Sequence, residues 1–272
     1  MHMRAVARLQ LETALRRAIE RQEFLIYYQP IVSLLTGRIS GFEALVRWQH
    51  PEKGIVLPGE FISTTEEMGL SILIDEWVLR EACRQIKQWQ DRFPPASTAL
   101  GVRPLFVSVN LSEPRFKQPD LLLQISQVLQ ETGLDANTLK LEITENVIME
   151  KDAQACQWLE QLRNLGIKLD VDDFGTGYSS LSRLHHFPIN GLKIDRSFVS
   201  GDSKDKGNLD IVETIVTLAQ KLDVDVTAEG VETKEQLALL KSLKCELGQG
   251  YFFSKPLSSS AAEALIIASP QW

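Results

Sequence analysis

Two adjacent carboxylates, Asp172 and Asp173, lie between a short strand with apolar residues at 167, 169 and 171 and the glycines Gly175 and Gly177. Carboxylates at the point where a strand ends and a flexible turn begins can hold a hard cation, because magnesium, manganese and calcium prefer oxygen ligands. An ordinary acidic turn has the same composition, with glycine supplying positive φ. This stretch leaves both interpretations open, and the rest of the chain has to decide between them.

Polar residues recur at or near the ends of the other strands that the sequence predicts. They are Glu43, Asn110, Glu142, Lys193 with Asp195, Glu229 and Gln249. The carboxyl ends of parallel strands converge on one mouth of a barrel, where active sites lie. Any one of these residues could be a helix cap or part of a surface ion pair. Caps and surface ion pairs explain poorly why polar residues occur at the ends of so many successive strands. Glu43 lies in the middle of its strand, so its register depends on the structure.

Five acidic residues would meet at that mouth: Glu43, Glu142, Asp172, Asp173 and Glu229. Like charges at short range raise one another's pKa, so cations are needed to keep such a cluster ionised. Two divalent metals would remove the repulsion, and Asn110 offers a neutral carbonyl ligand. The four histidines show no zinc-ligand spacing, which favours magnesium or manganese. Paired metals bridged by a carboxylate are typical of enzymes that hydrolyse phosphate esters.

Three charged residues near this cluster each allow two interpretations. Lys193 beside two cations would have a lowered pKa and could orient or deprotonate a water, or it could form a structural ion pair. Arg47 follows Glu43 by four residues and faces the same side of the strand, so it suits a phosphate clamp; it could also be an exposed edge charge. Glu145 could hold the loop at 173–180 or belong to an N-cap box.

The elements that position these residues begin with a helix at 5–21 and two strands at 24–34 and 38–48. The two strands are joined through Thr36-Gly37, and a connection that short makes an antiparallel hairpin. Helices are predicted at 58–69 and 71–93.

From residue 105 onward, strands and helices alternate. The strands are predicted at 105–111, 139–144, 167–171, 191–195, 224–228 and 248–252, and the helices at 120–131, 151–165, 179–187, 208–222, 234–243 and 258–267. Alternation implies a parallel sheet with helices outside it. Eight strands, one of them reversed by the hairpin, predict an α/β fold: a modified TIM (β/α)8 barrel with one antiparallel strand, forming a single domain over 5–272.

Composition excludes several function classes. The formal net charge is −7 with no basic run, which argues against binding long nucleic acid through its phosphates. No apolar stretch reaches the length of a membrane span, and the N-terminus has no signal-peptide pattern. The three cysteines show no ligand-like spacing and are expected to be reduced thiols of a cytoplasmic protein. Residues 1–3 look like an expression scar and are not expected to belong to the domain.

The segment Glu43-Ala44-Leu45-Val46-Arg47 resembles the signature of EAL-domain cyclic di-GMP phosphodiesterases. Seven further segments match the motifs of that family, at 28–31, 108–112, 141–145, 172–180, 192–195, 228–232 and 248–256. The resemblance runs from about Leu11 to the C-terminal helix. Each motif alone is weak, but the combination is specific.

The resemblance implies a TIM-like barrel that hydrolyses one phosphodiester bond of cyclic di-GMP, with two Mg²⁺ or Mn²⁺ ions, to the linear dinucleotide pGpG. Carried over by position, the first metal would be held by Glu43, Asn110, Glu142 and Asp172, and the second by Asp173 and Glu229. Lys193 corresponds to the residue that positions or deprotonates the water, so Lys193, Glu229 and Glu43 are the expected catalytic residues.

Other positions are also implied by the resemblance. The expected substrate contacts are Gln29, Arg47, Asp195, Glu232, Gln249 and Pro256. Together with Glu145, the loop Asp173–Ser180 resembles the element of the family that couples a dimer interface to metal binding. This loop includes Phe174, Gly175, Thr176 and Gly177. A homodimer is therefore implied, and such domains commonly follow a sensor or cyclase-like module in a longer regulatory protein.

Two alternatives to an active phosphodiesterase stay open at this stage. One is a receptor that binds cyclic di-GMP and signals without turnover. The other is a barrel glycosidase using two carboxylates, which the crowd of acids with Asn110 and Lys193 fits poorly. Members of the family without activity usually lack a metal ligand, the lysine or the glycine-rich loop, and all of these are present here.

Overall fold

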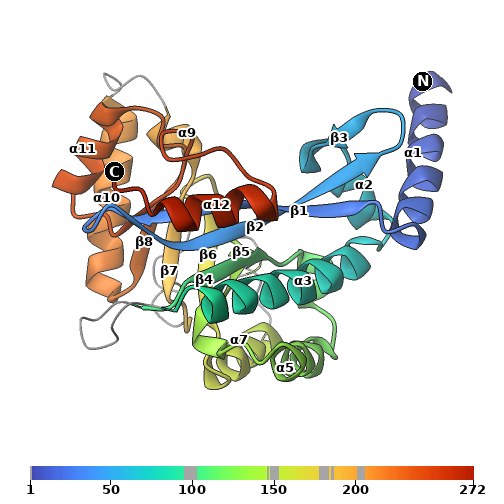
Figure 1. Cartoon of the computed structure of the whole chain (residues 1–272), viewed down its shortest axis with the longest axis horizontal. Helices are drawn as coiled ribbons and strands as arrows, with labels where there is room; N and C mark the ends of the chain where they lie inside the picture. The colour runs from blue at the N-terminus through green and yellow to red at the C-terminus, as the bar shows by residue number, and fades with distance from the viewer. Residues whose placement is uncertain are drawn as a thin grey trace.

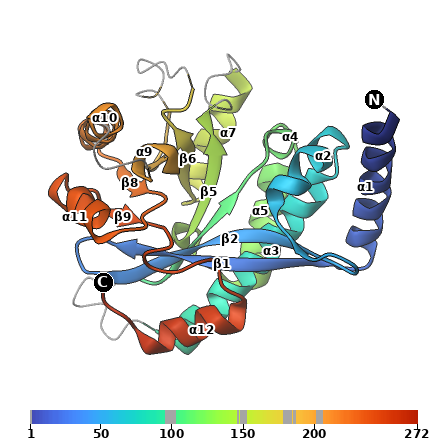
Figure 2. The ribbon, with the colours of Figure 1, turned by 90° about the horizontal axis from the view of Figure 1, so that it is seen from above.

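The structure is a computed structural model, which describes residues 2–94, 103–145, 147, 153–177, 184, 187–200 and 206–272. The chain begins with the helix α1 (His2–Glu20). Leu15 and Ala18 of this helix are fully buried. Figures 1 and 2 show α1 and α2 at the open end of a long hairpin, far from α10 and α11.

Eight strands close into a barrel. Around the ring they follow the order β1, β9, β8, β7, β6, β5, β4, β2, and pairing of β1 with β2 closes the ring. Their bounds are Phe24–Ser33 (β1), Arg38–His50 (β2), Phe106–Asn110 (β4), Leu139–Thr144 (β5), Lys168–Phe174 (β6), Gly191–Ile194 (β7), Asp225–Ala228 (β8) and Leu247–Gly248 (β9). β1 is antiparallel to β2 and β9, whereas the other neighbours are parallel. The predicted modified TIM barrel with one antiparallel strand is confirmed.

Helices surround the strands (Figure 2). They are η1 (Pro58–Glu60), α2 (Ile62–Glu67), α3 (Ser71–Arg92), α4 (Glu113–Phe116), α5 (Leu121–Thr132), η3 (Ala136–Thr138), α7 (Ala153–Asn164), α9 (Arg196–Val199), α10 (Lys206–Leu222), α11 (Lys234–Ser242) and α12 (Ser259–Ala268). α3 packs against the hairpin strands of the barrel, since the ring of Trp89 lies 4.9 Å from that of Tyr28 on β1 and 5.1 Å from that of Phe42 on β2. All three side chains are buried, which fixes the strand that carries Glu43.

Three predicted elements differ from the structure by several residues. The strand expected at 167–171 continues to Phe174, so Asp172 and Asp173 lie within β6. The helix expected at 58–69 is divided into η1 and α2, because Phe61 between them has a non-helical backbone (φ −135°, ψ −23°). The strand expected at 248–252 ends at Gly248, and the chain then turns, with the amide of Phe253 donating to the carbonyl of Gly250. The helix predicted at 179–187 lies largely outside the described residues.

Four short elements were not predicted: β3 (Gly54–Val56), α4, η3 and α9. Each has only three or four residues, too few to show a helical or strand period in the sequence. β3 pairs with the end of β2 outside the ring. The unpredicted segments therefore decorate the barrel and leave its strand order unchanged.

Cys83 and Cys245 are free and buried, as expected for reduced thiols. Burial raises the pKa of each thiol to about 12, which makes both poor nucleophiles. The side chain of Cys156 lies outside the described part. Within that part, none of the helices combines the length and the apolar character needed to cross a membrane.

The inside of the barrel is polar on three neighbouring strands. Residues two apart on a strand face the same side, and each of β5, β6 and β7 carries such a pair: Lys140 and Glu142, Asp170 and Asp172, Gly191 and Lys193. Lys140, Glu142, Asp170 and Lys193 are at most 2% exposed. The strands therefore build two polar layers, the upper of which contains the predicted metal ligands.

Gly41 lets β2 approach β4 closely enough to place Glu43, two residues further along. A Cβ atom at Gly41 would lie 2.5 Å from the carbonyl oxygen and 2.6 Å from the ring of Phe106. We expect Gly41→Ala to lower the free energy of unfolding by about 2 kcal/mol, because overpacking forces backbone shifts. Gly59→Ala is the matched control, since no atom lies within 4 Å of its added Cβ. Urea unfolding of both variants checks this, and equal stability would contradict it.

Candidate active site

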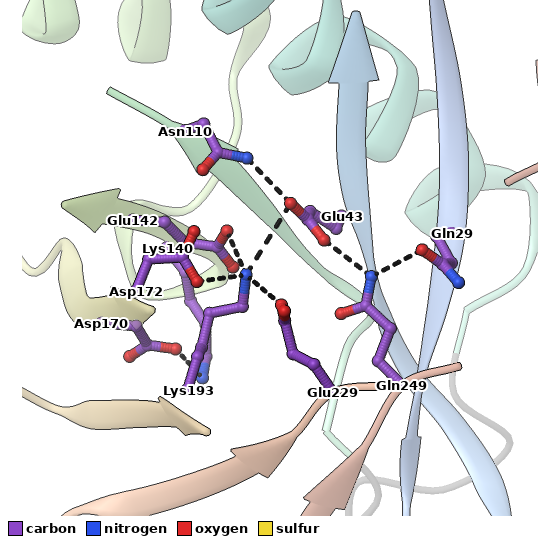
Figure 3. Close-up of polar contacts among 10 residues, drawn as sticks. All are labelled: Gln29, Glu43, Asn110, Lys140, Glu142, Asp170, Asp172, Lys193, Glu229 and Gln249. Carbon is purple, nitrogen blue, oxygen red and sulfur yellow. Dashed lines mark hydrogen bonds and ion pairs between the residues drawn. The ribbon is translucent and has the colours of Figure 1, made fainter. Parts of the chain in front are cut away.

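Lys193 stands at the centre of the polar cluster (Figure 3). Its Nζ lies 2.7 Å from Glu142 Oε2, 2.7 Å from Glu229 Oε1, 3.0 Å from Asp172 Oδ1 and 3.7 Å from Glu43 Oε1. The four acids come from β5, the end of β8, β6 and β2. The structure thus brings together residues separated by up to nearly two hundred positions in the sequence, as the convergence of strand ends predicts.

Glu43 is fixed by two amide side chains. The Nδ2 of Asn110 donates to Glu43 Oε1 at 2.8 Å, and the Nε2 of Gln249 donates to Glu43 Oε2 at 2.6 Å. Gln249 also donates to the Oε1 of Gln29 at 3.0 Å, and Gln29 donates to the carbonyl of Ser254 at 3.2 Å. The structure gives the register of Glu43, which the sequence left open. Its Cα lies opposite that of Gln29 across the hairpin and opposite that of Ser108 on β4.

Burial and mutual repulsion shift the pKa values of Glu142 and Glu229. Burial, together with the charges of Glu43 and Asp172, raises the pKa of Glu142 well above its usual range, although Lys193 opposes the shift. The same causes raise the pKa of Glu229 to about 7. Both groups therefore favour protonation unless positive charge is supplied.

The pKa of Lys193 is also raised, which for a lysine favours the charged form. Burial by itself would lower the pKa of its ammonium, but the surrounding carboxylates outweigh burial and raise the pKa well above the ordinary value. The sequence analysis expects a lowered pKa for Lys193 beside two cations. When only the protein groups act on Lys193, the four carboxylates raise its pKa. Among the protein groups, Lys193 therefore forms ion pairs with the neighbouring acids, as the second of its two interpretations states.

Oxygen atoms suited to hard cations gather beside Lys193. Ligand atoms of Asp172, Asp173 and Glu229 all lie within 4.8 Å of one another, and Glu142 Oε1 is buried without a hydrogen-bond partner. Asp173 adopts φ 52°, a left-handed conformation uncommon for a residue other than glycine. Burial and the nearby Asp172 and Asp195 raise the pKa of Asp173. These donors fit magnesium or manganese, which prefer carboxylate oxygens.

The predicted substrate contacts lie around this cluster in different settings. Arg47 is 7% exposed, so the alternative of an exposed edge charge is wrong. Its Nη1 donates to the carbonyl of Val46 at 2.8 Å, and its guanidinium lies 5.6 Å from the centre of the Tyr27 ring. Asp195 caps α9 by accepting from the amide of Ser197 at 2.9 Å.

Glu232 and Pro256 stand further out. Glu232 is exposed, and Pro256 is half-buried beside Leu257, whose amide donates to the carbonyl of Tyr28. Neither residue makes a hydrogen bond to the Lys193 cluster within the described part of the chain. Gln29, Arg47 and Gln249 are thus buried near Glu43, whereas Glu232 and Pro256 belong to the rim.

Glu145 contacts the glycine-rich loop. Its Oε2 accepts from the amide of Gly175 at 3.3 Å, and a Cβ added to Gly177 would lie 2.9 Å from Glu145 Oε1. Gly175 has φ +99°, which favours glycine. Thr176 Oγ1 donates to the carbonyl of Asp173 at 2.9 Å, and Phe174 is buried. The loop beyond Gly177 lies outside the described residues.

A second ion pair beneath the cluster was not predicted. Lys140 Nζ lies 2.7 Å from Asp170 Oδ2, and each side chain is 3% exposed. A signal was present in the sequence, because each residue precedes a predicted metal ligand by two positions on its strand and so shares the inward face.

Comparison with known proteins identifies the family, because the family model of the EAL domain matches residues 12–256 of this chain. The chain belongs to the EAL domain family. This EAL domain is 41% identical, over 98% of its length, to cyclic di-GMP phosphodiesterase NbdA of Pseudomonas aeruginosa. It is 42% identical, over 92% of its length, to oxygen sensor protein DosP of Escherichia coli.

The chain covers 33% of NbdA and 30% of DosP, so it spans about a third of the length of these curated relatives. Among solved structures, the PaMucR phosphodiesterase in complex with c-di-GMP superposes with a TM-score of 0.87 at 38% identity, over 93% of this chain and 99% of that one. The EAL domain is thus homologous to cyclic di-GMP phosphodiesterases.

Removal of the central ammonium should destabilise the protein in a pH-dependent way. We expect Lys193→Met, with EDTA present, to lose about 3 kcal/mol at pH 8, because buried carboxylates are left unpaired. Groups whose folded pKa is raised contribute stability below their unfolded pKa and lose it as pH rises through the folded value. For Glu229 that window ends at about 7, so the defect should shrink at pH 5.5.

Urea unfolding at both pH values measures this effect. Lys221→Met, which removes an exposed lysine of α10, is the matched control and should change stability little at either pH. A Lys193→Met defect that is the same at pH 5.5 and pH 8 would contradict the electrostatic explanation.

Proposed function

We propose that this EAL domain hydrolyses one phosphodiester bond of cyclic di-GMP and releases linear pGpG. The observation that carries the proposal is the buried cluster in which four carboxylates from separate strands surround Lys193 at 2.7–3.7 Å. Such a cluster is costly to fold, and its donor set fits the metal-dependent hydrolysis of a phosphate ester. Homology to cyclic di-GMP phosphodiesterases supports the choice of substrate.

Charge balance supports two divalent cations, Mg²⁺ or Mn²⁺. Five carboxylates face one ammonium here, counting Asp173 beside Asp172. Two divalent ions would supply about the positive charge that the cluster lacks. Glu43, Asn110, Glu142 and Asp172 would hold the first ion, and Asp173 with Glu229 the second.

Bound metal ions would supply an activated water and would stabilise charge on the attacked and leaving oxygens. The chain's own groups hold the site in shape for this chemistry. Asn110 and Gln249 orient both oxygens of Glu43 through hydrogen bonds of 2.8 and 2.6 Å. Lys193 donates to Glu142 and Glu229 and presents a charged ammonium at the centre of the cluster, which suits a group that positions the attacking water.

Residues near Glu43 would orient the nucleotide. Arg47 carries a guanidinium suited to a phosphate oxygen, and Gln29 with Gln249 forms a linked pair of amides beside Glu43. Asp195, Glu232 and Pro256 would contact the substrate from the rim. Burial lowers the pKa of Arg47, yet guanidinium remains charged in proteins, so a phosphate would supply a matching negative charge.

A receptor that binds cyclic di-GMP without turnover is the second candidate. The observation that favours it is the set of ion pairs made by Lys193 itself, which give the acids a partner from within the protein. A glycosidase is disfavoured, because its two carboxylates must flank a sugar bond, whereas the acids here converge on a lysine.

Turnover of cyclic di-GMP by purified protein tests the proposed function. With Mg²⁺ or Mn²⁺ we expect cleavage to pGpG, and EDTA should abolish it. Glu43→Gln and Lys193→Ala should each lower kcat/KM by about 10³-fold or more, because each removes a group that orders the reacting site. The control Glu213→Gln changes an exposed acid of α10 and should retain wild-type turnover.

Other outcomes distinguish the candidates. Binding of cyclic di-GMP without cleavage under either metal would support the receptor. Cleavage that resists EDTA would contradict metal-dependent hydrolysis.

We further propose that Glu145 couples the glycine-rich loop to metal binding. Glu145→Ala removes the acceptor of the Gly175 amide and frees the segment that begins at Asp173. We expect the Mn²⁺ concentration for half-maximal activity to rise about tenfold, while kcat at saturating Mn²⁺ stays within about threefold. Glu160→Ala on α7 is the control, because Glu160 is exposed. A loss of kcat with unchanged metal dependence would contradict the coupling.

The setting of the domain is part of the same proposal. Because the matched relatives are about three times longer, we propose that a sensor or cyclase-like domain controls this module in a longer protein. Family resemblance supports a homodimer, which sedimentation of the purified domain would test. An internal second messenger as substrate supports a cytoplasmic location.

A further inference from the structure

Lys140 and Asp170 form a buried ion pair directly beneath the acidic cluster (Figure 3). On β5, Lys140 precedes Glu142 by two residues, and on β6, Asp170 precedes Asp172 by two. Alternate residues of a strand face the same side about 6.6 Å apart. The pair therefore forms the next layer of the barrel interior below the expected metal ligands.

The contacts of this pair fill the layer tightly. Lys140 Nζ lies 2.7 Å from Asp170 Oδ2 and 4.8 Å from the centre of the Phe106 ring. On the neighbouring strand, Gly191 faces Asp170, and a Cβ added there would lie 2.5 Å from Asp170 Oδ1. Gly191 precedes Lys193 by two residues, so the carboxylate of Asp170 occupies the space below the lysine.

A buried ion pair is weak evidence for stability, because desolvation offsets the attraction and apolar residues of similar size often do as well. TIM-barrel interiors are ordinarily filled by branched apolar side chains. The placement of two opposite charges under a cluster of acids calls for another explanation. Electrostatic interactions reach across one layer when no water lies between.

We propose that Lys140 and Asp170 are positioning residues that set the affinity of the site above them for divalent cations. The inference rests on the proposed two-metal function. The paired charges cancel, so the acids above determine the local potential. An unmatched Lys140 would repel a divalent cation, and an unmatched Asp170 would attract one.

Direct Mn²⁺ binding to the protein without substrate, followed by the electron paramagnetic resonance signal of free Mn²⁺, tests this inference. We expect Asp170→Asn to weaken binding about tenfold and Lys140→Met to strengthen it about tenfold. The double variant Lys140→Met/Asp170→Asn should return to within about threefold of wild type. Lys221→Met is the control: it removes an exposed positive charge of α10 and should change affinity less than about threefold.

The outcomes separate this inference from the proposed function. A structural role would make both single variants bind more weakly and the double variant weaker still, which would overturn the inference. Unchanged affinity in all variants would overturn it as well. Should Asp170→Asn fail to fold by circular dichroism, tighter binding by Lys140→Met and recovery in the double variant would support it, and their absence would overturn it. A wild-type protein that binds no Mn²⁺ would instead refute the two-metal function itself.

Discussion

The attraction between the Lys193 ammonium and the surrounding carboxylates is the interaction on which the site depends. Four acids lie within 2.7–3.7 Å of one nitrogen, in an interior where unpaired charge is expensive. The positive charge of Lys193 opposes the rise in the pKa values of Glu142 and Glu229, which nevertheless stay raised and so favour protonated acids that bind metal poorly. The lysine thus holds the acids close together and offsets part of their repulsion.

The barrel makes this arrangement possible by joining distant segments at one depth. Parallel pairing sets Asn110 opposite Glu142 and Thr144 opposite Asp172, and the reversed β1 sets Gln29 opposite Glu43. A reversed first strand adds an amide from its own middle to the mouth of the barrel, and Gln29 there supports Gln249 and through it Glu43. The antiparallel strand therefore contributes to the site as well as to closure of the ring.

The fold and most of the site could be predicted from the sequence, because both depend on local patterns. The strand period indicated which residues share a face, and the short connection through Thr36-Gly37 required a hairpin. The strand predicted at 248–252 is present but ends at Gly248, because hydrogen bonds between Val231 and the chain at 249–252 turn the chain away from the sheet. That contact is distant in sequence, so local patterns could not show it. The sign of the Lys193 pKa shift and the burial of Arg47 also depend on neighbours that only the folded chain brings together.

The Lys140–Asp170 pair was overlooked for a different reason. Neither residue lies at the carboxyl end of its strand, so a search for polar groups at the barrel mouth passes over both. Their meaning follows from the layer above: a charge buried one layer below five carboxylates must be matched, or it changes what those carboxylates bind. Gly191 makes room for Asp170 at the cost of a side chain that could have packed the interior. The barrel therefore has an ion pair of no net charge beneath the site in place of apolar packing. The acids above this pair then set the electrostatic potential at the mouth of the barrel.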